Sequence, residues 1–317
     1  MSQPARRRHS SRRYAVRRAI ALAIVVLVGF GVVRLVGAVL SGDDSVADAE
    51  GTTTPDDGVG DDSDTESGGG AANGIATDAA ISDDVADEPE TTGPPSVDNP
   101  SKVFIVGDSD AGTFGPYLQT LLDNTGIVTT ELDYKVSSGL SRPDFFDWPA
   151  EIDAKLPEVD PDIVVATFGG NDAQGLAVQN GEFIIGDPVA NEAEWVAEYS
   201  ERAGAVMDQL LADGRTLIWV GIPNDDNPEV TARMAIQDRA ARAAAAERPE
   251  VIFIDTWQRF SGRDGGWAEF VIDPRDGQGK DVRADDGFHL NQTGAEILAI
   301  DIAQAIRDTL REQGAQI

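Results

Sequence analysis

One serine in the chain stands where its neighbours could make it a nucleophile. Ser109 follows the short apolar run Lys102–Val106, and a helical pattern of apolar residues follows the serine. A serine between a strand and a helix lies near backbone N–H groups without a helical partner and near the positive end of the helix dipole, so negative charge on its oxygen would be stabilised. The same pattern is also typical of an ordinary helix cap. Ser109 therefore needs partners before a chemical role can be assigned to it.

His289 and Asp286 have the residue types and the spacing of such partners. The chain has two histidines, His9 and His289, and only His289 belongs to the region that follows Ser109. An aspartate three residues before a histidine can bend back and hold one ring N–H, which leaves the other ring nitrogen free to take a proton from a serine. A surface ion pair near a helix start is the simpler interpretation of the same two residues.

Two further stretches offer N–H donors at the ends of predicted strands. Gly139 follows the second predicted strand, and a glycine there lets its backbone N–H approach a substrate closely. Asn171 follows the third predicted strand, in Gly169-Gly170-Asn171-Asp172, and could point its side-chain amide at the same place. Each stretch taken alone also has the composition of an ordinary turn. Together with Ser109 and His289, and each beside a strand end, they favour a site at which a serine is the nucleophile and N–H groups stabilise a negatively charged oxygen.

The elements that must position these residues alternate between strand and helix. The expected strands are Lys102–Val106, Thr129–Val136, Ile163–Phe168, Thr216–Val220 and Val251–Ile254; the expected helices are one that includes Phe114 and Leu118 with Pro116 in its first turn, then Glu192–Ala212, Pro228–Ala246 and Gln292–Arg311. This alternation predicts an α/β fold, a three-layer sandwich with a central five-stranded parallel sheet. Ligands of such sheets bind beyond the carboxyl ends of the strands.

Three segments between these elements are candidates to shape a substrate site. Arg142–Trp148 contains three aromatic residues, which could stack on a sugar or belong to the core. Asn180–Pro188 is expected to form a small hairpin or flap. Ser261–Asp285 is expected to be a long irregular stretch, rich in glycine and charge.

The region before the predicted domain divides into three parts. Residues 1–18 form a basic tail, residues 19–40 are apolar except for Arg34, and residues 41–100 form an acidic linker without a Lys or Arg. About 20 apolar residues can cross a bilayer as a helix, and the basic flank predicts a cytoplasmic N-terminus and an extracytoplasmic domain over residues 101–317. A cleaved signal peptide, with a cleavage site near Val36-Gly37-Ala38, is the alternative, and it also exports the domain. The linker has too little apolar surface to fold and is expected to be disordered.

Composition excludes several kinds of site. The chain has no cysteine, which removes disulfides, thiolate metal sites and a cysteine nucleophile, and its two histidines cannot form a multi-histidine metal centre. Residues 101–317 hold 39 acidic and 17 basic side chains, a formal net charge of −22. A domain with this charge repels phosphate backbones, so we expect no nucleic-acid partner.

The same residues resemble the four sequence blocks of the SGNH (GDSL-type) hydrolase superfamily, in the family's order, from Lys102 to the last helix. Gly107-Asp108-Ser109 resembles the first block, Gly139 the glycine of the second, Gly170-Asn171-Asp172 the third, and Asp286 with His289 the Asp-x-x-His of the last. Asp110 stands where the first block usually has leucine, which could alter the packing or the charge next to the serine. Only the glycine of the second block is recognisable. The run Asp108–Gln119 looks like a bacterial, membrane-anchored branch of the superfamily.

The resemblance implies a flavodoxin-like SGNH-hydrolase domain that acts through an acyl-enzyme. Ser109 would be the nucleophile, His289 the general base and Asp286 its orienting partner, and the backbone N–H groups of Ser109 and Gly139 with the side chain of Asn171 would form the oxyanion hole. No metal or organic cofactor is required. The expected function is an extracytoplasmic serine esterase that hydrolyses short-chain O-acyl esters of a cell-envelope carbohydrate.

Two other functions stay open on the same sequence. An O-acyltransferase would use the same residues and pass the acyl group to a hydroxyl of an envelope glycan. A catalytically silent envelope-binding module would keep the fold without the reaction. The expected partners are therefore an acyl-ester substrate, small or glycan-borne, and the membrane through the N-terminal helix.

Overall fold

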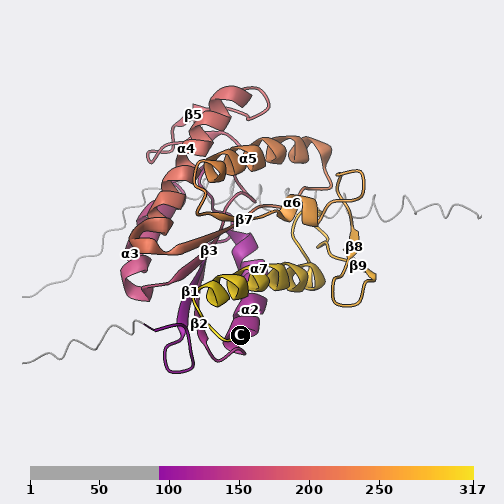
Figure 1. The fold of residues 1–317 in the computed structure, drawn as a ribbon. Helices are drawn as coiled ribbons and strands as arrows, with labels where there is room; N and C mark the ends of the chain where they lie inside the picture. The colour runs from indigo at the N-terminus through magenta and orange to yellow at the C-terminus, as the bar shows by residue number, and fades with distance from the viewer. Residues whose placement is uncertain (1–92) are drawn as a thin grey trace, which may run out of the picture. The chain divides into compact units, whose positions relative to one another are not determined.

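The computed structural model describes residues 93–317, which contain a five-stranded parallel sheet (Figure 1). Its strands are β1 (Ser101–Gly107), β2 (Val128–Tyr134), β3 (Ile163–Thr167), β6 (Thr216–Val220) and β7 (Ile252–Ile254), in the order β2-β1-β3-β6-β7. Every neighbouring pair is parallel. This confirms the predicted α/β class and the five predicted strands. The predicted basic tail, the apolar segment 19–40 and the linker as far as residue 92 lie outside the described residues.

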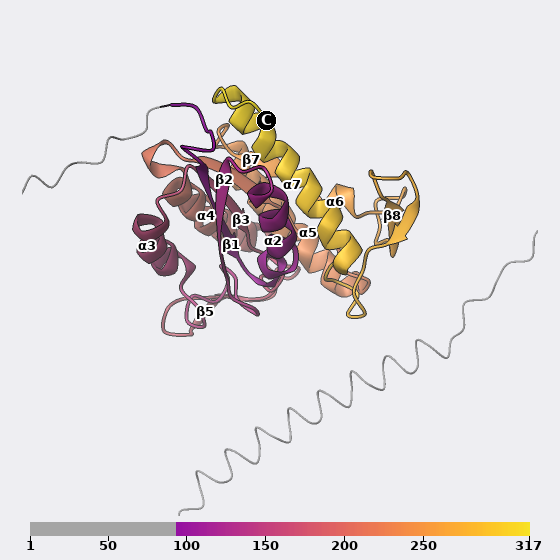
Figure 2. The same ribbon diagram turned by 90° about the horizontal axis from the view of Figure 1, so that it is seen from below.

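Helices cover both faces of the sheet (Figure 2). The helices on one face are α2 (Ser109–Asp123) and α7 (Gln292–Glu312), and those on the other are α3 (Trp148–Val159), α4 (Glu192–Leu211) and α5 (Pro228–Ala246). Alternate residues of β1 belong to the two cores, with Val103 and Ile105 toward α2 and α7, and Phe104 and Val106 toward the other three helices. Because β1 is buried on both faces, its sequence is a continuous apolar run.

Helix α2 begins earlier than the sequence predicts. The expectation that Pro116 lies in the first turn is wrong, because the helix starts at Ser109 and Pro116 lies inside it. Gly112 and Gly115 are poor helix formers, which hides the first turns from a propensity argument. Both glycines face β2: a Cβ on Gly115 would lie 2.7 Å from the side chain of Leu132, and one on Gly112 would overlap Tyr134. The two glycines therefore let α2 pack closely on the sheet next to the serine.

Helix α3 and one hairpin were not expected from the sequence. Helix α3 begins at Trp148, the last residue of Arg142–Trp148, and the segment Ser261–Asp285, expected to be irregular, contains a hairpin of β8 (Phe270–Ile272) and β9 (Gly279–Asp281). The hairpin predicted near Asn180–Pro188 consists of β4 (Leu176–Ala177) and β5 (Phe183–Ile185). The remaining short elements are η1 (Ala212–Gly214) and α6 (Thr256–Arg259). Among residues 93–317 no helix has both the length and the apolar character needed to cross a bilayer.

Candidate active site

Ser109, His289 and Asp286 form one chain of hydrogen bonds at the carboxyl edge of the sheet. Ser109 is the first residue of α2 and follows β1, and His289 lies in the loop that leads to α7. The Ser109 Oγ lies 2.9 Å from His289 Nε2, and His289 Nδ1 lies 2.6 Å from Asp286 Oδ2. The side chains of Ser109 and His289 are partly exposed, so a substrate can reach them. The structure therefore brings together three residues that the sequence separates by up to 180 positions.

The charge of Asp286 determines which ring nitrogen of His289 carries the proton. The hydrogen bond from His289, and backbone N–H groups of Phe288 and His289 that donate to Asp286 Oδ1 at 3.1 and 3.0 Å, lower the pKa of Asp286 to about 2. An ionised Asp286 can only accept, so Nδ1 of His289 is the donor. Nε2 is then the acceptor for the Ser109 hydroxyl. Asp286 also raises the pKa of His289 above its usual value, because it stabilises the imidazolium.

Asp108 connects the serine turn to the loop after β3. Its buried carboxylate accepts from the backbone N–H of Asp110 at 2.9 Å and from those of Gly169 and Gly170 at 3.0 Å each. Burial and the neighbouring Asp110 carboxyl raise the pKa of Asp108 well above its usual range. Gly107, the last residue of β1, must be a glycine because a Cβ there would overlap the carbonyl oxygen of Thr167 at the end of β3. These hydrogen bonds hold the turn before Ser109 against the loop that carries Asn171.

The structure places Gly139 and Asn171 side by side. The side-chain amide of Asn171 lies 3.4 Å from the carbonyl oxygen of Ser138, whose peptide bond carries the N–H of Gly139. Asn171 follows β3 and Gly139 follows β2, the two strands on either side of β1. An amide side chain has two N–H groups, so Asn171 keeps one for a ligand. The predicted oxyanion-hole residues thus come from the loops that flank Ser109.

Asp172 holds the loop that carries Gly139, a role that the sequence did not reveal. Its buried carboxylate accepts from the backbone N–H groups of Leu140 and Ser141 at 2.9 and 2.8 Å and from the hydroxyl of Tyr199 at 2.6 Å. Gln237 in turn donates to the Tyr199 oxygen at 3.0 Å. The network reaches from the loop into α4 and α5. Its partners are far apart in sequence, and the only signal was the polar Asp172 inside a motif.

Arg283 holds the loop that carries His289, and it too was missed. The guanidinium is buried and donates to the carbonyl oxygens of Phe288 at 2.8 Å, Asn224 at 2.9 Å and Phe260 at 3.0 Å. Its backbone forms an isolated bridge with Leu290, so Arg283 touches the chain on both sides of His289. Burial lowers the pKa of Arg283 to about 10, which leaves it charged at neutral pH.

The aromatic segment before α3 belongs mostly to the core. Trp148 is 1% exposed and its ring packs edge-on against Phe146, with centroids 4.8 Å apart, whereas Phe145 is 52% exposed. Trp148 is therefore a core residue and is not exposed to stack on a sugar. A hollow of about 390 Å³ adjoins this segment, and its lining includes Gly139.

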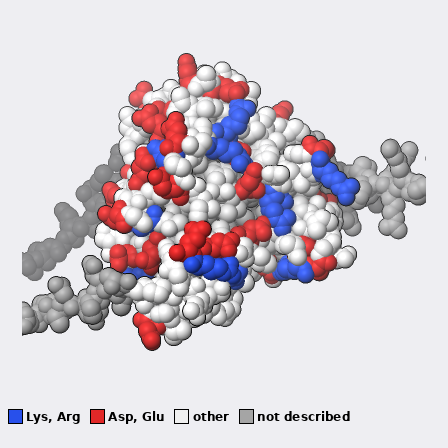
Figure 3. All heavy atoms as spheres, viewed as in Figure 1, with Lys and Arg blue, Asp and Glu red and all other residues white. Residues whose placement is uncertain are grey.

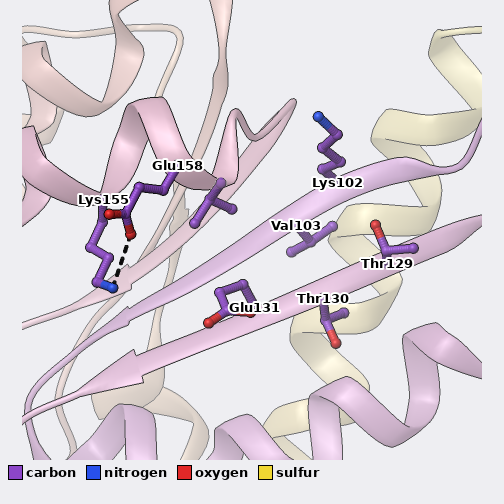
Figure 4. A pocket seen from close by; sticks show the side chains of 8 residues that line it. Lys102, Val103, Thr129, Thr130, Glu131, Lys155 and Glu158 are labelled. Atoms are coloured by element: carbon purple, nitrogen blue, oxygen red, sulfur yellow. Dashed lines mark hydrogen bonds and ion pairs between the residues drawn. The ribbon is translucent and has the colours of Figure 1, made fainter.

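Another hollow, of about 410 Å³, lies at the opposite end of the sheet (Figure 4). It is lined by Lys102 and Thr129 near the starts of β1 and β2, and by Lys155 and Glu158 of α3, which form an ion pair at 3.2 Å. None of the residues around Ser109 lines it. The carboxyl edge of the sheet is therefore the site that the chemistry indicates.

No curated protein matches the sequence. The chain resembles a GDSL-like lipase from Bacteroides thetaiotaomicron (18% identity, 66% of this chain and 89% of that chain, TM-score 0.41) and a psychrotrophic esterase from a Pseudoalteromonas species (13%, 67% and 99%, TM-score 0.43). It also resembles the C-terminal catalytic domain of peptidoglycan O-acetyltransferase A from Streptococcus pneumoniae (16%, 68% and 96%, TM-score 0.42). Residues 102–305 match a family described as "Protein of unknown function (DUF459)", and the chain belongs to that family.

Proposed function

We propose that this protein is a serine esterase that cleaves O-acyl esters through an acyl-enzyme. The observation that carries the proposal is the hydrogen-bonded chain from Ser109 through His289 to Asp286, at 2.9 and 2.6 Å. A nucleophile within reach of a base, and a base oriented by a third group, is the arrangement on which covalent acyl transfer depends. A mere helix cap at Ser109 would not need a histidine from another loop.

The proposed reaction runs in two steps on these groups. The Ser109 oxygen attacks the ester carbonyl while Nε2 of His289 takes the hydroxyl proton, and Asp286 stabilises the imidazolium at Nδ1. The tetrahedral intermediate collapses, the imidazolium gives its proton to the departing alcohol, and an acyl-serine remains. Water then attacks the acyl-serine while His289 takes its proton, and the second tetrahedral intermediate collapses as the imidazolium returns that proton to the Ser109 oxygen and the acid is released.

The negative oxygen of the intermediate needs donors, and the N-terminus of α2 offers the backbone N–H of Ser109. The N–H of Gly139 and the side chain of Asn171 lie in the two loops beside it. Preorganised donors of this kind stabilise the transition state more than the substrate, and each is typically worth about 10²–10³ in rate.

Hydrolysis of p-nitrophenyl acetate by the purified full chain tests the proposal. We expect Ser109→Ala to abolish turnover with an unchanged far-UV circular dichroism spectrum, and Ser200→Ala, a partly buried serine on α4, to leave turnover unchanged. Turnover retained by a folded Ser109→Ala variant would refute the proposal. A fluorophosphonate probe should label the wild type but neither Ser109→Ala nor His289→Ala, whereas a silent binding module would give no label in any of them.

The natural substrate and the compartment are part of the proposal. We propose that the domain lies outside the cytoplasm and acts on an O-acylated carbohydrate of the cell envelope, which the apolar segment 19–40 and the acidic linker support. Protease added to intact cells should remove the domain and leave the tail protected. Release of acid from an acetylated glycan with and without a sugar acceptor separates the two reactions, since an acyltransferase would shift the acyl group to the acceptor.

A further inference from the structure

Three residues that each carry a buried, unpartnered oxygen atom line one small cavity behind Ser109. Asp110 Oδ2, Thr167 Oγ1 and Thr256 Oγ1 have no hydrogen-bond partner among residues 93–317, and their residues are 6%, 0% and 0% exposed. All three residues line the same cavity of about 10 Å³, and most of the remaining lining is apolar. Buried polar groups in folded proteins nearly always have a partner. One cavity with three such groups therefore indicates a ligand that all three share.

Size and chemistry identify that ligand as water. A cavity of roughly 10–15 Å³ has room for a single water, and a buried water typically makes two to four hydrogen bonds. A water can donate a proton to the Asp110 carboxylate and accept the hydroxyl protons of Thr167 and Thr256. The three residues come from the start of α2, the end of β3 and the start of α6, so the water would join three elements behind the serine.

Asp110 lies near both residues that flank His289. The position that a Cβ on Gly170 would occupy lies 3.1 Å from Asp110 Oδ2 and 3.1 Å from the ring of Phe288. Leu290, on the other side of the histidine, lines the same cavity as Asp110. The carboxyl of Asp110 therefore lies behind the loop that presents the imidazole, whereas Asp286 holds the ring directly at Nδ1.

We propose that Asp110 is a positioning residue, a second carboxylate that stabilises the imidazolium of His289, and that one water bound by Asp110, Thr167 and Thr256 keeps this carboxylate ionised. The inference rests on the proposed function, because the imidazolium forms when His289 takes the serine proton.

The other charged groups around His289 set the size of this effect. Asp286 and Asp108 are also negative toward the imidazole, and the buried Arg283 is the cation that faces Asp110. Burial raises the pKa of Asp110 to about 6, against the opposing charges of His289 and Arg283. Asp110 is therefore ionised at neutral pH, where the esterase would work.

Titration of the His289 ring by NMR in the full chain tests the proposal. The variant His9→Gln leaves His289 as the only histidine, so its signal needs no further assignment. In that background we expect Asp110→Asn to shift the imidazole titration to lower pH and to move the acid limb of kcat/KM the same way. Asp123→Asn removes an exposed charge from the other end of α2 and should move neither.

An unchanged His289 titration in a folded Asp110→Asn variant would overturn the proposal. Asp110→Leu, the residue usual at this position in the resembling superfamily, gives a second test if the amide variant does not fold. The wild type also gives a test, since a crystal structure should show one density peak at hydrogen-bond distance from all three oxygens, and a dry cavity would refute the water.

The two proposals fail in different ways. If the protein is not an esterase, p-nitrophenyl acetate stays intact while the His289 titration still shifts in Asp110→Asn. If Asp110 has no influence on the histidine, hydrolysis depends on Ser109 while the titration curves of wild type and variant coincide.

Discussion

At the scale of single residues, the site depends on a proton that His289 must be able to accept. Asp286 raises the pKa of His289 above its usual value of 6.5, and the carboxylates of Asp110 and Asp108 act in the same direction. A stabilised imidazolium makes the histidine a stronger base in the transition state, but it also leaves less neutral imidazole at a given pH. The acidic surroundings of His289 therefore influence both the rate and the pH range of the proposed reaction.

The first prediction concerns the pH profile. Only neutral His289 can take the serine proton, so kcat/KM should rise with pH through a value above 6.5 and then level off. Asp286→Asn should move this limb to lower pH and lower kcat by about 10²–10⁴-fold, because the ring loses the partner that fixes its tautomer. The measurement is hydrolysis of p-nitrophenyl acetate from pH 5 to 9. A variant with unchanged kcat would show that Asp286 does not orient the base.

The second prediction concerns Asn171. Asn171→Ala removes one proposed donor to the oxyanion and should lower kcat by about 10²–10³-fold with little change in KM, since the donor acts mainly in the transition state. Gln304→Ala, which changes an exposed amide on α7, is the matched control and should stay within a few-fold of wild type. A rise in KM alone would assign Asn171 to substrate binding.

Local sequence was enough to predict that Ser109, Asp286 and His289 lie together, because each lies in a motif whose neighbours fix its geometry. Asp172 and Arg283 could not be predicted in the same way. The Asp172 carboxylate accepts from Tyr199, 27 positions away, and Arg283 donates to Asn224, 59 positions away. Partners at such separations follow from the packing of whole elements, which no short motif contains.

At the scale of elements, two loops that carry the proposed chemistry are fixed by buried polar groups. Asp172 holds the loop after β2, and Arg283 holds the loop before α7. Each anchor satisfies several backbone groups at once, and a buried polar group that loses its partner costs about 1–3 kcal/mol. Substitution of an anchor should therefore affect the site and the stability together.

The third prediction concerns Gly139. A Cβ at this position would overlap the Asp172 carboxylate, so Gly139→Ala must displace the loop that carries the N–H donor. We expect kcat/KM to fall by about 10²–10³-fold while the protein stays folded. Gly279→Ala is the control, because a Cβ there has no atom within 4 Å. Wild-type kinetics in Gly139→Ala would exclude this loop from the site.

The fourth prediction concerns Arg283. Arg283→Met leaves the carbonyl oxygens of Phe288, Asn224 and Phe260 without this donor, and we expect the free energy of unfolding to fall by about 3 kcal/mol or more. Arg283→Lys should rescue only part of the loss, because an ammonium cannot reproduce the planar fork. Urea unfolding followed by tryptophan fluorescence measures both. The exposed Arg311→Met should change the free energy of unfolding by less than about 0.5 kcal/mol.

Elements with a strong local signal were predictable and those without one were not, for a physical reason. Helix α5 matches its predicted bounds, Pro228–Ala246, because an N-terminal proline and an alanine-rich run define it locally. Helix α3 was missed since Pro157 lies inside it and its apolar face is small, with Trp148, Ile152 and Leu156 buried. Two- and three-residue strands such as β4 and β8 have too few side chains to produce a period.

At the scale of the whole molecule, the distribution of acidic groups links stability to pH. Acidic side chains lie over much of the face seen in Figure 3, many of them beside a Lys or Arg. Arg275 lowers the pKa of Asp273 to about 2, and His289 does the same for Asp286. Each carboxyl with a lowered pKa stabilises the fold at pH values above its unfolded pKa of 3.8, and that stabilisation is lost as the pH falls toward 2.

Asp110 and His289 both have a raised pKa in the folded state, so they lower the stability of the fold as the pH rises. The folded pKa of Asp110 is about 6 against 3.8 unfolded, so the folded state binds more protons between these values and stability falls as the pH rises through them. The pKa of His289 is also raised, so its stabilising interaction is complete below 6.5 and is lost as the pH rises through the folded pKa. Both groups therefore favour mildly acidic conditions.

The fifth prediction follows from these opposed slopes. The thermal unfolding midpoint of the full chain should be highest between about pH 4 and 6 and should decline on both sides, because carboxylates protonate below this range and Asp110 and His289 lose protons above it. Asp110→Leu removes one of the groups whose raised pKa makes stability fall with pH, so its midpoints at pH 5 and pH 8 should lie closer together than those of the wild type, whatever the absolute stability of the variant. Calorimetry from pH 3 to 9 at constant ionic strength measures both curves. A wild-type maximum at pH 8 or higher would mean that the buried carboxyls behind Ser109 are not protonated in the way their burial requires.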